Sequence, residues 1–171
     1  VNNGVCILKA PTGSGKTNKV LQLLYEEHSE YCTYIVHRRS IARSVMLGMS
    51  HYQDDVLPFK EISIRALRIV VNSLIKENLK KITNKASLLL VDEAQQTLNH
   101  VVSCRLGDES DRELIYNEFL ELVKKTKKVV MCDADINDSL IEFVTDSGRD
   151  VFVYQVETNH SEIQICVNDL D

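Results

Sequence analysis

The chain has 171 residues, enough for one domain with a substantial core but too few for two full domains. Hydrophobic residues make up 44% and charged residues 26%, and charged side chains interrupt every apolar run before it is long enough to cross a bilayer. A formal net charge of −5 excludes attraction of nucleic acid by the whole-molecule field, so any such contact requires a local basic patch.

Short β-branched runs alternate along the chain with segments of helical period, a pattern typical of strand–helix–strand units around a parallel sheet. Residues 51–64 are the least regular and predict a long surface loop. Helices are expected over 17–27, along the apolar stripe of 41–49, around 115–123 and around 136–144. The expected strands are 5–8, 31–36, 68–71, 88–91, 129–131 and 151–156, with 163–167 as a further candidate. The fold class is therefore α/β, with a mostly parallel central sheet flanked by helices.

The amino-terminal stretch lacks the features of a secretion signal. No basic residue precedes the first apolar segment, so a signal peptide is not expected. We expect a soluble, intracellular protein without a membrane partner, cytoplasmic or, if viral, in the host nucleus.

The five cysteines show no metal-binding pattern. Their number is odd, no C-x-x-C pair occurs, and four of them lie in apolar, strand-like segments. We interpret them as buried free thiols in a reducing compartment. They are Cys6, Cys32, Cys104, Cys132 and Cys166.

A glycine-rich segment, A-P-T-G-S-G-K-T at 10–17, follows the first expected strand and matches the Walker A pattern from its second position on. Its glycines let backbone N–H groups turn inward around a polyphosphate. Lys16 can reach the β- and γ-phosphates of ATP, and the Thr17 hydroxyl can ligate Mg²⁺. A chance turn is disfavoured because the segment sits between a strand and a helix. The expected nucleotide-binding residues are Pro11, Thr12, Gly13, Ser14, Gly15, Lys16 and Thr17.

A second signal is the run L-L-L-V-D-E-A-Q at 88–95, four apolar residues that end in two acids. Such a run predicts a buried strand whose tip emerges at the edge of the sheet where ligands bind. Asp92 can hold Mg²⁺, and Glu93 can orient and activate the water that attacks the γ-phosphate.

The order A-P-T-G-S-G-K-T followed by D-E-A-Q resembles motifs I and II of DEAD/DEAH-box proteins, the superfamily 2 helicases. The resemblance implies a RecA-like ATPase domain in which Lys16 and Glu93 serve catalysis. It also implies that Gln95, which stands in place of the usual histidine, links the nucleotide site to the next motif.

Motif III of that family is usually S-A-T, whereas D-A-D stands here at 133–135. This departure resembles the helicase domain of herpesvirus-type replication origin-binding proteins and their phage and plasmid relatives. The resemblance implies that Asp133 and Asp135 take part in coupling ATP hydrolysis to strand movement. The departure also removes the hydroxyl on which an S-A-T coupling step would depend.

Two further segments, V-H-R-R-S at 36–40 and V-V-N-S-L at 70–74, resemble motifs Ia and Ib. By itself the first is a solvated charged turn, but in the place of motif Ia it predicts phosphate contacts from a cluster at His37, with Arg38, Arg39 and Arg43 as the binding residues. Asn72 and Ser73 are candidates for further backbone contacts.

The resemblance implies an ATP-dependent nucleic-acid motor domain, with DNA favoured over RNA and a role in DNA replication. We interpret 1–171 as a single RecA-like domain whose second RecA-like half lies elsewhere, because no Q-x-x-G-R-x-x-R segment occurs. One alternative is a nucleotide-switch binding module without unwinding activity. Another is a small-molecule phosphotransferase, which the acid pair of D-E-A-Q disfavours.

Overall fold

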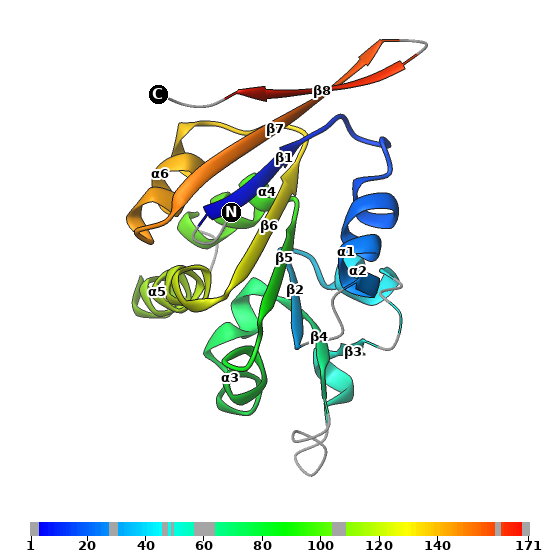
Figure 1. The fold of residues 1–171 in the computed structure, drawn as a ribbon. Coiled ribbons are helices and arrows are strands. Elements are labelled where there is room, and N and C mark those ends of the chain that lie inside the picture. The colour runs from blue at the N-terminus through cyan, green and yellow to red at the C-terminus, as the bar shows by residue number, and fades with distance from the viewer. Residues whose placement is uncertain are drawn as a thin grey trace.

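In the described part of the computed structural model, eight strands form one sheet in the order β3-β4-β2-β5-β6-β1-β7-β8. The structure describes residues 4–27, 31–45, 48, 50–56, 64–103, 109–159 and 162–168. All neighbouring strands are parallel except β7 and β8, which form an antiparallel hairpin at one edge (Figure 1). The strands are β1 (Gly4–Lys9), β2 (Cys32–Val36), β3 (His51–Tyr52), β4 (Ala66–Val70), β5 (Leu88–Asp92), β6 (Lys128–Asp133), β7 (Asp150–Asn159) and β8 (Glu162–Asn168).

Helices cover both faces of the sheet (Figure 1). On one face lie a π-helical segment (Lys16–Leu21), α1 (Gln22–Glu27) and α2 (Arg39–Ser44). On the other lie α3 (Glu77–Thr83), α4 (Ala94–Val102), α5 (Glu109–Lys125) and α6 (Asp138–Asp146). Short 3₁₀ turns follow β3 at Gln53–Asp55 and β4 at Val71–Ile75.

The central strands are buried on both faces, which explains their unbroken apolar runs. In β5, Leu88 and Leu90 pack on the α1–α2 side, whereas Leu89 and Val91 pack against the opposite helices. All four are almost fully buried, and each contributes roughly 1.5–3 kcal/mol relative to an exposed position. Two hydrophobic cores, one on each face, thus stabilise the sheet whose carboxyl edge carries the site.

The strand predictions are confirmed, with small shifts at the ends, and the α/β class is confirmed with them. The expected loop over 51–64 instead begins with β3, a two-residue strand paired with β4, and 57–63 lie outside the described residues. The expected helix over 17–27 opens with π-helical turns before it becomes α-helical at Gln22.

The helix expected over 41–49 is shorter than its apolar stripe predicts. It ends at Ser44, because Val45 is extended with ψ 122°. The guanidinium of Arg68 donates to the carbonyls of Ala42, Arg43 and Val45 at 3.0, 3.1 and 2.6 Å. These carbonyls therefore have a tertiary partner, and the helix need not continue to satisfy them. Met46 and Met49 lie outside the described residues.

A buried arginine ties the amino-terminal end of the sheet together. Arg149 donates to the carbonyls of Val123 at 2.9 Å and Gly4 at 3.1 Å, and also to that of Thr126. It thereby joins the end of α5, the turn before β6 and the start of β1.

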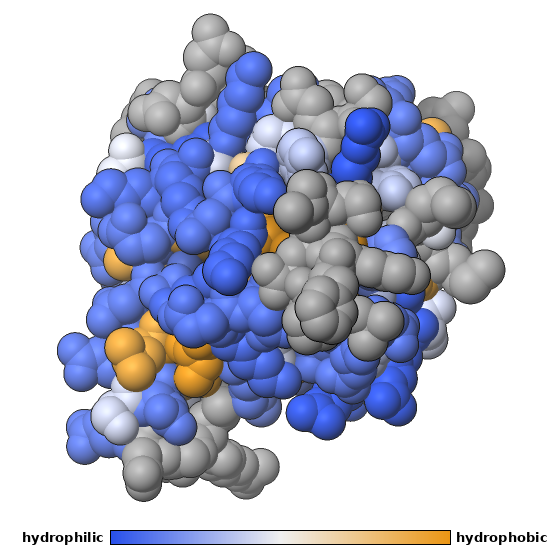
Figure 2. Space-filling model, turned by 90° about the horizontal axis from the view of Figure 1, so that it is seen from below, coloured by the Kyte–Doolittle hydropathy of each residue, from blue (hydrophilic) through white to orange (hydrophobic). Residues whose placement is uncertain are grey.

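The face seen from below in Figure 1 is mainly hydrophilic where it is described, with a small hydrophobic patch at one side (Figure 2). The exposed large hydrophobic side chains of the described segments are those of Leu23, Val102 and Leu114. Within those segments, no helix combines the length and apolar character that a membrane span requires.

The described cysteines behave as expected from the sequence. Cys6, Cys32 and Cys132 are free thiols, the latter two buried. Burial raises the pKa of Cys6 to about 11 and that of Cys32 to about 12, so both thiols are unreactive at neutral pH. The thiols of Cys104 and Cys166 lie outside the described side chains.

Candidate functional site

The loop between β1 and the first helix has a backbone that requires glycine. Gly13 has φ 78° and Gly15 has φ 84°, both in the left-handed region. The Ser14 amide donates to the Pro11 carbonyl at 3.2 Å, and the Ala10 amide donates to the Asp133 carbonyl at 3.0 Å. The loop is therefore anchored to the end of β6.

The side chains of Lys16 and Ser14 make no hydrogen bond beyond their own loop within the described residues. Lys16 Nζ donates to the carbonyls of Ala10 at 2.5 Å and Pro11 at 2.9 Å, so its ammonium folds over its own loop. The Ser14 hydroxyl is buried and makes no hydrogen bond within the described structure. An oxyanion in the loop would be an acceptor for both groups.

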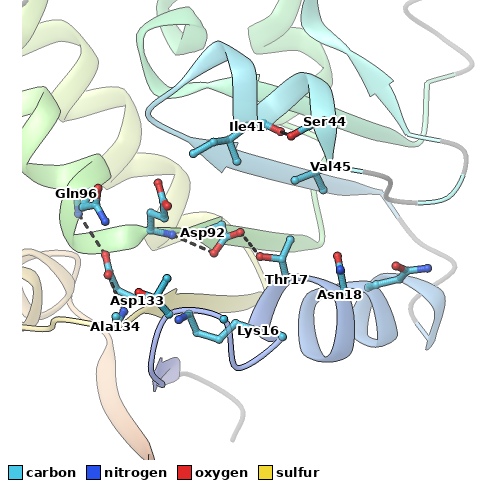
Figure 3. Close-up of a pocket in the computed structure, with 15 residues that line it drawn as sticks. Lys16, Thr17, Asn18, Ile41, Ser44, Val45, Asp92, Gln96, Asp133 and Ala134 are labelled. Atoms are coloured by element: carbon cyan, nitrogen blue, oxygen red, sulfur yellow. Dashed lines mark hydrogen bonds between the residues drawn. The ribbon is translucent and has the colours of Figure 1, made fainter.

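Asp92, the last residue of β5, is held by two hydroxyl groups. Thr17 Oγ1 donates to Asp92 Oδ2 at 2.6 Å, as Figure 3 shows, and Tyr34 Oη donates to the same oxygen at 2.9 Å. Asp92 is only 4% exposed, so these contacts stabilise a buried carboxylate facing the glycine-rich loop.

The role of Tyr34 was missed by the sequence analysis. Its ring is buried in β2, and burial together with the neighbouring Asp92 raises the pKa of its hydroxyl. A tyrosine inside a fully buried strand usually has a hydrogen-bond partner. That signal was present in the run C-T-Y-I-V, but it does not say which residue is the partner.

Replacing Tyr34 by phenylalanine should lower the free energy of unfolding by about 1.5–3 kcal/mol, because a hydrogen bond to a charged group is lost. Urea denaturation would measure the change. Tyr31→Phe, which removes a hydroxyl from a half-buried ring just before the same strand, is the matched control and should change stability by less than about 0.5 kcal/mol. Equal losses in both variants would contradict a specific Tyr34–Asp92 bond.

Glu93 lies at the turn from β5 into α4. Its φ of 49° makes it the one non-glycine residue in the described segments with positive φ. Its amide donates to Asp92 Oδ1 at 3.1 Å. Burial, with the charges of Asp92 and Asp133, raises the pKa of its carboxyl group.

His37 was predicted to lie in a surface cluster with Arg38, Arg39 and Arg43, but its side chain is buried. Its side chain is 8% exposed, and Nδ1 lies 3.3 Å from Glu93 Oε2. This contact does not meet the geometry of a hydrogen bond, and Nδ1 has no hydrogen-bond partner among the described residues. Burial, with Arg38 and His100 nearby, lowers the pKa of this imidazole, which makes it a neutral neighbour of the glutamate.

The two aspartates of D-A-D separate in the structure. Asp133 is buried, and its Oδ2 accepts from the Gln95 amide at 2.9 Å at the start of α4. The same oxygen accepts from the Gln96 amide at 3.3 Å (Figure 3). Its Oδ1 accepts from the Ala134 amide at 2.6 Å. Asp135 is exposed and lines a smaller hollow of about 390 Å³ beside Lys9.

Gln95 bridges the turn after β5 and the turn after β6. Its Nε2 donates to Ser139 Oγ and to Asn99 Oδ1, both at 3.0 Å, and its Oε1 accepts from the Asn137 amide at 3.1 Å. Gln95 thus contacts the turn that follows D-A-D, and the sequence did not indicate these partners.

The glycine-rich loop and the acid pair share one hollow of about 790 Å³ at the carboxyl edge of the sheet (Figure 3). One wall comes from α2 and the residue after it, through Ile41, Ser44 and Val45. The other lining residues are Thr12, Gly13, Gly15, Lys16, Thr17, Asn18, Gln22, Asp92, Glu93, Gln96, Asp133 and Ala134.

The candidate nucleic-acid residues follow two paired strands. Val36 of β2 is the register partner of Val70 of β4, so the motif Ia and Ib turns begin at the same edge. The side chains of Arg38 and Arg39 are exposed at the start of α2. Of the other candidates, Arg43 is exposed but contacts Asp54 at 3.4 Å and the Tyr52 ring, Asn72 is half-buried, and Ser73 is buried.

A mostly parallel sheet with a glycine-rich loop after β1 and paired acids after β5 defines the RecA-like P-loop NTPase fold. The chain belongs to the origin of replication binding protein family, whose model matches residues 1–161.

The chain is also similar to one curated protein in sequence and to one solved structure in fold. The chain is 23% identical over 146 residues to an uncharacterized putative helicase, R8, of Acanthamoeba polyphaga mimivirus, covering 76% of this chain but 13% of that protein. It also resembles the crystal structure of a hypothetical ATP-dependent RNA helicase from Sulfolobus tokodaii, with a TM-score of 0.62 and 16% identity over 90% of this chain and 48% of that one. The chain is a nucleotide-binding, helicase-type P-loop domain and spans less than half the length of either relative.

Proposed function

We propose that this chain is the ATP-binding motor domain of a superfamily 2 helicase or translocase that acts on nucleic acid in DNA replication. The observation that carries the proposal is that one hollow brings together Lys16, Thr17, Asp92 and Glu93. These are the residues that the DEAD/DEAH-box resemblance assigns to phosphate, metal and water.

The loop around Gly13 and Gly15 is the proposed binding site for the phosphates of ATP. Lys16 Nζ is held only by carbonyl oxygens, and a phosphate oxygen is a stronger, charged acceptor for an ammonium group. The unpartnered Ser14 hydroxyl gains an acceptor in the same complex.

The contact between Thr17 and Asp92 is suited to Mg²⁺. A hydroxyl and a carboxylate oxygen 2.6 Å apart form a pair of hard oxygen donors next to the proposed phosphate-binding site. Thr17 and Asp92 would hold Mg²⁺, which would neutralise phosphate charge, while the Tyr34 hydroxyl keeps Asp92 in place.

Glu93 is the candidate base for the attacking water. Its carboxylate lines the hollow, and its raised pKa brings it closer to neutral, where general bases work best. Asp133 and Gln95 bind the turns after β5 and β6 to each other, so movement of the β6 turn would be transmitted to α4.

Arg38 and Arg39 are the leading candidates for contacts with nucleic-acid phosphates, because they are exposed on the motif Ia turn. Arg43, Asn72 and Ser73 remain weaker candidates. The family's description as origin-binding favours DNA. A second RecA-like domain is proposed as the partner that closes the cleft.

Replacing Lys16 by alanine should abolish measurable ATP binding in calorimetry. Each charge-assisted hydrogen bond to phosphate contributes about 1.5–3 kcal/mol, and no other cation among the described residues lines the hollow. In the full-length protein, the same variant should lose ATP hydrolysis with and without single-stranded DNA.

Lys19→Ala is the control, since Lys19 is exposed one turn further along the same helix and does not line the hollow. An unchanged affinity of Lys16→Ala for ATP would refute the assignment of this loop as the phosphate-binding site. A wild-type protein that binds ATP but does not turn it over with DNA would instead support the nucleotide-switch module.

A further inference from the structure

The β2–α2 turn contains one side chain that faces inward toward the candidate base. His37 directly follows β2, and its Nδ1 lies 3.3 Å from Glu93 Oε2 without completing a hydrogen bond. At 3.3 Å the two atoms lie just beyond ordinary hydrogen-bond distance, so a small shift of either side chain would change their interaction.

The same turn also carries the two exposed arginines that we propose bind phosphate. Arg38 and Arg39 are exposed and are the two residues that follow His37 in the chain. A force on either arginine side chain therefore acts on the backbone that carries the His37 imidazole. On its other side, the ring of His37 lies 6.1 Å from that of His100 on α4.

We infer that His37 is a positioning residue that couples nucleic-acid binding at the β2–α2 turn to the placement of the Glu93 carboxylate. This inference rests on the proposed function. Without nucleic acid, the turn holds the carboxylate beside Nδ1. Phosphate contacts at Arg38 and Arg39 shift the turn and change that contact, so the rate of hydrolysis responds to nucleic acid.

Glu93 is suited to such control because only its side chain is free to move. Its backbone is fixed at φ 49°, its amide is bonded to Asp92, and its carbonyl accepts from the Thr97 amide at 2.7 Å in the first turn of α4. The carboxylate is 36% exposed, whereas the His37 side chain is 8% exposed. The more exposed carboxylate can therefore respond to a displacement of the imidazole while the Glu93 backbone stays in place.

The test uses the full-length protein and measures ATP affinity, single-stranded DNA affinity, and the rate of hydrolysis with and without DNA. His37→Leu removes the nitrogen and keeps apolar bulk. His37→Asn places an N–H near the position of Nδ1, whereas His37→Gln places it further from the backbone, near Nε2. His100→Leu removes the ring contact and leaves the Glu93 contact intact, as a control for packing.

We expect His37→Leu to lower the stimulation of hydrolysis by DNA by about fivefold or more, the lower end of typical coupling between two sites. Both affinities should stay within about twofold of wild type, since the imidazole does not line the hollow and the proposed phosphate contacts come from Arg38 and Arg39. His37→Asn should restore most of the stimulation, His37→Gln should not, and His100→Leu should behave as wild type.

Normal stimulation in His37→Leu, or equal loss in His37→Leu and His100→Leu, would overturn the inference. If His37→Leu does not fold, the Asn and Gln variants decide, and equal stimulation in those two would overturn it. A wild-type protein without DNA-stimulated hydrolysis would contradict the proposed function itself, whereas a stimulated wild type with insensitive His37 variants contradicts only the coupling role.

Discussion

Replacing Glu93 by glutamine should leave ATP binding intact and reduce turnover of the full-length protein by about 10²–10⁴-fold, the usual contribution of a general base. The amide has the shape of the carboxylate, so the hollow keeps its form. It cannot accept a proton from water, and no other described acid lies at this turn except Asp92 and Asp133. Those two are buried and already engaged by Thr17 and by the amides of α4, respectively.

Single-turnover hydrolysis and a nucleotide-binding titration on the same preparation would separate the two effects. Glu113→Gln is the matched control, because it makes the same chemical change at an exposed position on α5. Near-normal turnover in Glu93→Gln would show that another group positions the water.

The 171-residue chain by itself should bind Mg-ATP weakly and hydrolyse it about 10³–10⁵-fold more slowly than the complete motor, the range supplied by an arginine finger. Lys16 is the only cation among the described residues that line the hollow. It approaches from the loop side, so charge that develops on the far side of the γ-phosphoryl group has no partner. Arg38, Arg39 and Arg43 belong to the turn and helix of the proposed nucleic-acid face and do not line the hollow.

Steady-state hydrolysis by the purified chain and by the full-length protein, each with and without single-stranded DNA, would measure this difference. The isolated chain should also be insensitive to DNA. Turnover of several per second with stimulation by DNA, from the isolated chain, would mean that a second RecA-like domain is not needed.

The sequence by itself determined the elements whose causes are local. Gly13 and Gly15 have the positive φ that only glycine adopts without strain, so the loop could be located from its amino-acid sequence. The unbroken apolar run that becomes β5 predicts a strand buried on both faces, and Asp92 and Glu93 necessarily emerge at its end. The strand order and the pairing of β7 with β8 did not follow from any of these patterns.

Only the tertiary structure decided which side chains meet. The Tyr34 hydroxyl finds Asp92 at a separation of 58 positions, and Gln95 receives the Asn137 amide from 42 positions away. Arg68 ends α2 earlier than the apolar stripe predicts, and His37 turns inward to Glu93 although its neighbours are exposed arginines. Periodicity and turn chemistry describe only a residue and its near neighbours along the chain. The partner of a buried polar group is chosen by which strands lie side by side, and the packing of the whole sheet decides that.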